Sequence, residues 1–144
     1  MKLTDILADA TLKARFIKEG AALIDQEVSR KGGLSGFALK TGYRAALAVK
    51  PGVIETVLDM LLPAFAPAIE PFFAAGQAAG DVPGHFAKNA SAIADAMLKV
   101  TDARAARAEN PVLKRTYSSL RSTAMQHTTE AIPAVGKLLA RFTS

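Results

Sequence analysis

Alanine fills 29 of the 144 positions of this chain, which limits the folds available to it. Alanine is the strongest helix former among the amino acids. Larger apolar residues recur at helical spacing, as in Leu12, Phe16, Leu23 and Val28, and no segment alternates as a convincing strand does. A chain of this length has the size of one domain. We therefore expect an all-α, single-domain bundle of six to seven helices over residues 1–144.

Glycine and proline set the expected helix boundaries. Gly32 and Gly33 supply a helix stop, Ser35 is expected as the next N-cap, and Asn110 with Pro111 is a helix start. The expected helices cover residues 11–30, 36–49, 53–62, 85–108 and 111–129, with a last helix after a break at Pro133.

The central segment is interrupted by prolines. Pro63, Pro67 and Pro71 follow one another at intervals of four, and a proline inside a helix removes one hydrogen bond. We expect residues 63–79 to form one kinked helix or two short pieces. The apolar side chains of this segment predict the centre of the core, with Phe65 and Phe72 buried. Its larger members are Phe65, Ile69, Phe72 and Phe73.

Composition narrows the class of protein. The chain has no cysteine, which removes disulfides and thiolate metal sites. Its charge-free windows are shorter than the roughly 20 apolar residues that span a bilayer, so no transmembrane segment is expected. The first 20 residues do not resemble a secretory signal. These features favour a cytoplasmic protein.

Residues 29–52 stand apart from the rest of the chain. They hold five glycines, five basic residues and no acidic residue. A helix N-terminus attracts anions through its free N–H groups and its dipole, so we expect this basic, Gly-rich turn to engage an anionic or protein partner. The alternative is a tight turn flanked by solvated bases. The candidate binding residues are Arg30, Lys31, Ser35, Gly36, Lys40 and Arg44.

Small residues mark the same segment. Ala38, Gly42, Ala45 and Ala46 would let another helix approach closely. That helix would belong to the same chain or, in the alternative, to a second copy, which would make the protein a homo-oligomer.

The rest of the chain carries no recognisable reaction chemistry. Lys99 to Arg121 is basic but lacks a nucleic-acid motif, so a solvated helix face is the better interpretation. His85 and His127 are expected at the surface, although Glu130 lies at pairing distance from His127 along a helix. We expect no catalytic residue, no metal site and no cofactor.

Three segments together resemble a known family. They are KGGLSGFALKTGYRAALAVKPG, LLPAFAPAIEPFF and VTDARAARAENPVLKRTYSSLR. The chain is similar over nearly its whole length to a family of small bacterial proteins classed as a domain of unknown function. The resemblance supports the helical interpretation and implies no activity. The chain departs from the family pattern at Pro67, which bears on the straightness of the middle helix.

The sequence therefore predicts a non-enzymatic cytoplasmic binding or assembly protein that uses the basic Gly-rich segment. A second hypothesis is a carrier of an apolar or lipid-like ligand. Its pocket would lie between kinked helices, beside Phe65, Ile69, Phe72 and Phe73.

Overall fold

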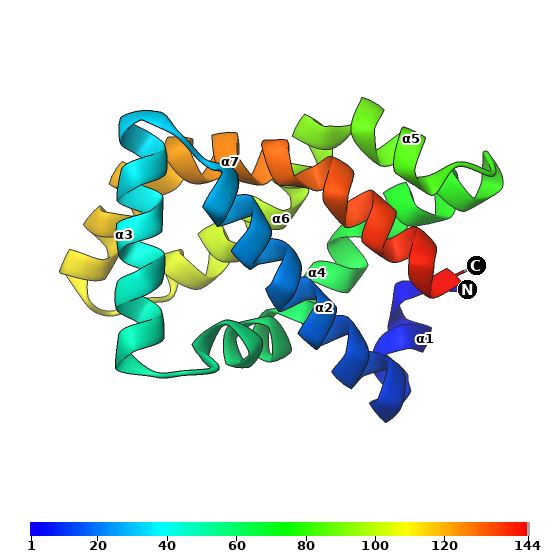
Figure 1. The fold of residues 1–144 in the computed structure, drawn as a ribbon, viewed down its shortest axis with the longest axis horizontal. Helices are drawn as coiled ribbons and strands as arrows, with labels where there is room; N and C mark the ends of the chain where they lie inside the picture. The colour runs from blue at the N-terminus through cyan, green and yellow to red at the C-terminus, as the bar shows by residue number, and fades with distance from the viewer. Residues whose placement is uncertain (144) are drawn as a thin grey trace. The chain divides into compact units, whose positions relative to one another are not determined.

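The computed structural model describes residues 1–143, apart from the side chain of Ser35. It contains seven helices and no strand within that range, which confirms the all-α prediction (Figure 1). The helices are α1 (Leu3–Ala8), α2 (Ala10–Arg30), α3 (Gly33–Val49), α4 (Val53–Ala78), α5 (Val82–Lys88), α6 (Ala90–Ala106) and α7 (Pro111–Thr143).

The chain divides into two compact units, Leu3–Pro63 and the part from Ala64 onward. In the first unit, α1 and α3 each contact α2. In the second unit, α7 packs along both α5 and α6. The single-domain expectation remains a prediction, because each unit has its own set of internal contacts.

Helix α2 forms as the amphipathic pattern predicts. Asp9 caps it by accepting hydrogen bonds from the backbone N–H groups of Thr11 and Leu12, at 2.9 and 3.0 Å. The helix continues to Arg30 and stops before the two glycines. Its link to α4 within the first unit includes an ion pair between Lys13 and Asp59, 2.9 Å apart.

Helix α4 is one continuous helix of 26 residues, which settles the two alternatives for residues 63–79 in favour of a single helix. The expected stop at residue 62 is therefore wrong. Pro63, Pro67 and Pro71 all lie on the exposed side of α4. A proline leaves the carbonyl four residues earlier without its helical donor, and water can satisfy that carbonyl on an exposed face. The helix can therefore continue through all three prolines.

The inward stripe of α4 differs from the expected one. The buried positions recur every three or four residues, at Leu62, Ala66, Ile69 and Phe73. Phe73 is completely buried, whereas Phe65 and Phe72 are only half-buried. The prediction that Phe65 and Phe72 are buried is wrong, because both lie beside the stripe and not on it.

The helix expected over 85–108 is divided into α5 and α6 at Asn89. The Asn89 side chain donates a hydrogen bond to the carbonyl oxygen of His85 at 2.8 Å, and its backbone N–H reaches the same oxygen at 3.1 Å. These bonds complete the end of α5, and α6 starts at Ala90. The core of the second unit is built from fully buried side chains, which are Phe73, Phe86, Ile93, Ile132 and Leu139.

Helix α7 begins where the sequence predicts and ends much later. Asn110 caps it by accepting the N–H of Val112 at 2.8 Å, and Pro111 occupies the first helical position. The break expected at Pro133 is absent, because α7 continues through this residue to Thr143. At Gly136 the helix meets α5, and a Cβ there would lie 2.7 Å from the Cβ of Phe86.

Candidate functional site

The predicted anion site lies at the start of α3. The helix begins at Gly33, whose φ of 72° is a conformation that favours glycine. Gly32 takes the N-cap position and makes no side-chain cap bond. The expectation that Ser35 caps this helix is therefore wrong, since Ser35 lies two residues inside α3. Its side chain lies outside the described residues.

Arg30 and Lys31 both lie beside one buried carboxylate, and Gly36 packs against the backbone of Lys31. Arg30 Nη2 lies 2.6 Å from Glu27 Oε1, and Lys31 Nζ lies 4.0 Å from Glu27 Oε2. Lys31 is itself buried, and a Cβ at Gly36 would lie 2.8 Å from its carbonyl carbon. Glu27 thus offsets one of the two positive charges of the first two predicted binding residues, and Gly36 gives the turn room to close.

Lys40 and Arg44 lie farther along α3, one turn apart. Lys40 is half-buried and Arg44 is exposed. Lys50 follows the last residue of the helix and is exposed as well. None of these three bases has an ion-pair partner within residues 1–143. Residues 28–54 contain no acidic side chain, and the carboxylates that act on α3, Asp25 and Glu55, lie near Tyr43 on its inward face.

One face of α3 packs inward. Gly36 is buried, and the half-buried residues of the helix adjoin it around the helical circumference. Tyr43 anchors this face, because its hydroxyl donates a hydrogen bond to Asp25 Oδ1 on α2 at 3.2 Å. Partial burial and the neighbouring Asp25 carboxylate raise the pKa of Tyr43, so the phenol stays neutral. The half-buried residues are Leu39, Lys40, Tyr43, Ala46 and Leu47.

The opposite face of α3 is exposed and almost entirely apolar. Leu34, Phe37 and Val49 are 91, 71 and 87 % exposed. At 3.6 residues per turn, the exposed positions cover about half of the helix circumference. Among the side chains that the structure describes, two of these positions after Gly33 carry polar groups, Thr41 and Arg44. This face consists of Leu34, Phe37, Ala38, Thr41, Gly42, Arg44, Ala45, Ala48 and Val49, and we call it the α3 outer face.

The expected close helix crossing at Gly42 is not formed within the chain. Gly42 is exposed, and a Cβ built there meets no described atom within 4 Å. The preferred form of the prediction, an internal crossing, is therefore wrong. A contact with a second copy stays a prediction.

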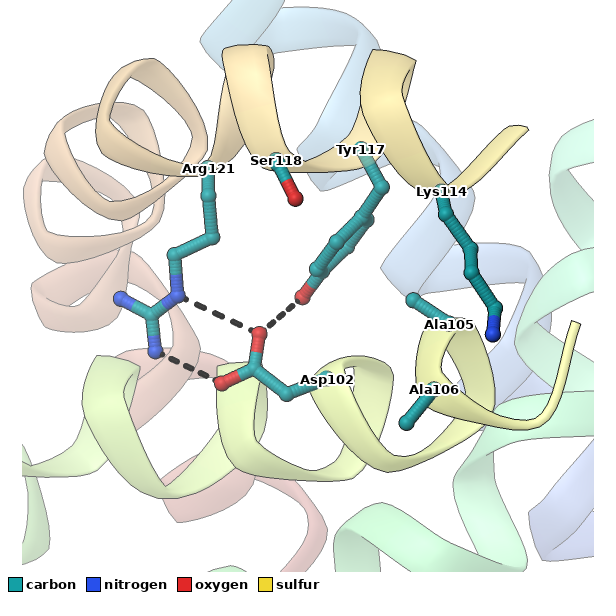
Figure 2. A pocket seen from close by; sticks show the side chains of 7 residues that line it. All are labelled: Asp102, Ala105, Ala106, Lys114, Tyr117, Ser118 and Arg121. Carbon is teal, nitrogen blue, oxygen red and sulfur yellow. Dashed lines mark hydrogen bonds and ion pairs between the residues drawn. The ribbon is translucent and has the colours of Figure 1, made fainter. Parts of the chain in front are cut away.

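An open pocket of about 400 Å³ lies in the second unit, between α6 and α7. Figure 2 shows Tyr117 and Arg121 extending from α7 toward Asp102 on α6. Two alanines of α6 form its apolar part. The lining residues are Asp102, Ala105, Ala106, Lys114, Tyr117, Ser118 and Arg121.

Asp102 is the centre of the hydrogen-bond network in this pocket. Arg121 holds it with two bonds, Nε to Oδ1 at 3.2 Å and Nη2 to Oδ2 at 2.9 Å. Tyr117 donates its hydroxyl proton to Oδ1 at 2.5 Å, and Thr101 Oγ1 lies 2.7 Å from the phenol oxygen. A second carboxylate, Asp95 Oδ1, lies 3.7 Å from Arg121 Nη2. The network joins α6 to α7 through charge-assisted bonds.

The pKa shifts in this network argue against acid–base catalysis. Hydrogen bonds from Arg121 and Tyr117 lower the pKa of Asp102. Burial, and then the bond to Asp102, raise the pKa of Tyr117. A general acid or base works best with a pKa near the working pH, and both shifts lead away from neutrality. The arrangement is that of a structural clamp.

The residues of this clamp are spread over two helices in the sequence. Thr101, Asp102, Tyr117 and Arg121 all stand in one of the segments that carry the family resemblance. Asp102 and Arg121 are 19 residues apart in the chain and meet only because α6 and α7 fold against each other. No local spacing signals that contact.

The four predicted pocket residues do not line this pocket. Ile69 and Phe73 are core residues, and Phe65 and Phe72 are half-buried. The carrier hypothesis therefore remains a prediction.

The expectation of a surface position is wrong for His127. Its side chain is only 10 % exposed, and its Nδ1 lies 3.8 Å from Glu130 Oε1. Both ring nitrogens are buried without a hydrogen-bond partner among the described residues. Within that same range, no group of three His, Cys, Asp or Glu side chains could hold a metal ion.

Helix α4 also has an unusual surface. By length and composition it is long and apolar enough to cross a membrane, although Glu70 interrupts its charge-free windows. Only 17 % of its most apolar window is buried, whereas the core helix of a soluble protein would be mostly buried. Two consecutive helices, α3 and α4, thus expose much apolar surface.

These observations define a small helical protein with a basic, outwardly apolar helix and a clamped helix pair. The chain belongs to the family of unknown function DUF6918, whose profile matches residues 3–143. This confirms the predicted resemblance to a domain of unknown function. No curated protein and no solved structure matches the chain.

Proposed function

We propose that this chain is a non-enzymatic cytoplasmic binding or assembly protein of bacterial cells that docks on an anionic partner through α3. The observation that carries the proposal is the α3 outer face. Soluble proteins rarely leave a continuous apolar patch of this kind on a helix without a partner. Leu34, Phe37 and Val49 would provide the contact area, and Lys40, Arg44 and Lys50 the charge.

The charge balance around α3 supports an anionic partner. The five bases of residues 28–54 equal the net charge of the whole chain, +5, and no acid lies among them. Arg30 and Lys31 are committed to Glu27, which leaves the later three as the docking charges. Basic groups beside an apolar face favour association with negative surfaces and speed the encounter.

The test compares two charge reversals of equal size. Lys40→Glu with Arg44→Glu changes the docking helix, and Lys114→Glu with Arg115→Glu changes two exposed bases in the first turns of α7. The control should fold normally, because negative charge is favourable near a helix N-terminus. The measurement is retention on immobilised polyphosphate as salt rises.

We expect the α3 pair to lose retention and the α7 pair to keep most of it. Wild-type retention should fall with salt, since electrostatic attraction is screened. Equal losses in the two pairs would mean that only net charge matters, and the proposed role of α3 would be wrong.

A further inference from the structure

The α3 outer face is continuous and long enough to act as a docking surface by itself. Its 17 residues extend over about 25 Å at 1.5 Å per residue. Phe37 and Leu34 project from its first turns, Val49 closes its far end, and between them lie alanine and glycine with Thr41 and Arg44. Lys40 and Arg44 follow one edge of this face, and Lys50 stands at its end.

The polar groups of this face need no partner, with one exception. Thr41 Oγ1 donates a hydrogen bond to the carbonyl oxygen of Phe37, at 2.9 Å, within the same helix. Of the described side chains on this face, Arg44 is then the one with donors to offer outward. Protein–protein interfaces typically carry about one hydrogen bond for each 100–200 Å². A face with so few outward hydrogen-bonding groups suits a partner that presents hydrocarbon, with negative charge only at its margin.

A second copy of the chain is a poor partner for this face. A two-fold contact would bring the same surface of each copy together. In an antiparallel two-fold pair, Lys40 and Arg44 of one copy would approach Arg44 and Lys40 of the other, because both lie near the middle of α3. The α3 outer face itself carries no acid that could separate them, and like charges across an interface oppose association.

From this geometry we infer that α3 is an interfacial membrane helix, which lies in the headgroup region of an anionic lipid bilayer. The inference rests on the proposed function and specifies that the anionic partner is a lipid bilayer. Leu34, Phe37 and Val49 enter the boundary of the acyl chains, and Lys40, Arg44 and Lys50 contact lipid phosphates. Basic residues beside an apolar face with Phe and Leu are the features of such helices. Long basic side chains can lie along the apolar surface while their charges stay among the headgroups.

The experiment uses the full chain with vesicles of phosphatidylcholine, with and without phosphatidylglycerol. Binding is measured by co-sedimentation at low and at high salt. The variants are Phe37→Ser, the Lys40→Glu and Arg44→Glu pair, and the matched controls Leu113→Ser and the Lys114→Glu and Arg115→Glu pair. Leu113 is a suitable control because it is 59 % exposed, on α7.

We expect Phe37→Ser and the α3 charge pair each to weaken binding to anionic vesicles about tenfold or more. Both controls should stay within about twofold of the wild type, since surface changes away from a contact have small effects. Binding should need the anionic lipid and should fall with salt. Equal binding to neutral vesicles, or equal losses in the controls, would overturn the inference.

Insertion itself can be observed directly because the chain contains no tryptophan. A Phe37→Trp variant places a single indole on the α3 outer face, and Leu113→Trp places one on α7. With anionic vesicles, we expect the fluorescence emission of the Phe37→Trp variant to shift to the blue. The emission of the Leu113→Trp variant should stay unchanged. A shift in the control alone would locate the membrane contact elsewhere and overturn the inference.

Two further readouts separate this inference from the proposed function. Retention on polyphosphate or polyglutamate that depends on Lys40 and Arg44, without vesicle binding, would refute the lipid partner and keep the anionic one. Loss of both would refute both proposals. If Phe37→Ser lowers the melting temperature, the α3 outer face is covered by the chain itself, and the inference is overturned.

Discussion

At the scale of single residues, two glycines inside helices have opposite surroundings. A Cβ at Gly42 would meet no described atom within 4 Å, whereas one at Gly136 would lie 2.7 Å from the Cβ of Phe86. Gly42→Ala should therefore stabilise the protein by about 0.5–1 kcal/mol, the helix-propensity difference. Gly136→Ala should destabilise it by about 1–3 kcal/mol through overpacking. Urea denaturation measures both, and a loss of stability in Gly42→Ala would show that something covers α3.

Asp102 gives the protein a defined sensitivity to acid. Its pKa in the folded state is lowered, first by the hydrogen bond from Arg121 and then by that from Tyr117. The stability it contributes is therefore complete above the pKa of the unfolded chain, about 3.9, and is lost as pH falls through the folded pKa. We expect Asp102→Asn to be less stable than the wild type at pH 7 and to lose less stability on acidification.

Denaturant midpoints between pH 7 and pH 2 test this expectation. Asp59→Asn is the control, because its carboxylate pairs with Lys13 in the first unit and is 59 % exposed. Exposed pairs contribute little, so this variant should follow the wild type. If the denaturant midpoints of Asp102→Asn and the wild type fall in parallel as pH is lowered, the clamp does not respond to protonation.

At the scale of elements, α4 continues through three prolines because all three lie on its exposed side. Proline in a helix interior costs about 3 kcal/mol relative to alanine, while its restriction of the unfolded chain returns about 1 kcal/mol. Pro67→Ala should therefore stabilise the protein by about 2 kcal/mol. Pro111→Ala, at the first position of α7, should have little effect, because proline is well tolerated there. A destabilised Pro67→Ala variant would indicate that its ring makes contacts of its own.

The same helix decides which phenylalanine matters. Phe73 is fully buried and Phe65 only half-buried. Phe73→Ala should cost about 3–5 kcal/mol of unfolding free energy, the range for a buried aromatic side chain, and Phe65→Ala less than half of that. Unfolding in denaturant measures both variants. Equal losses of unfolding free energy would contradict the assigned inward stripe of α4.

Sequence signals predicted helices well where the signal was local. The amphipathic pattern placed α2, and Asn110 with Pro111 placed the start of α7. Sequence signals failed where packing against other helices decides whether a helix ends or a side chain is buried. Pro63 and Pro133 do not end a helix, and Phe65 is not buried, because exposure and packing decide these outcomes. The clamp between Asp102 and Arg121 is a contact of this kind, formed by two packed helices.

At the scale of the whole molecule, the two units differ in how well their helices are covered. Helix α7 packs on both α5 and α6, and its C-terminal half contributes several buried side chains. Helix α3 contacts α2 along one side and exposes its other side to solvent. Since local opening follows the density of buried contacts, the stability of the chain should be uneven, with α3 at the lower end.

Hydrogen exchange followed by mass spectrometry measures this difference directly. We expect the amides of α3 to exchange far faster than those of α5 and of the C-terminal half of α7, with α2 between them. Anionic vesicles should slow exchange in α3 and leave α7 unchanged, because only α3 would gain a partner. Slow exchange in α3 of the free protein would show that its outer face is already covered in solution. Protection that appears in α7 instead of α3 would place the docking surface on the second unit.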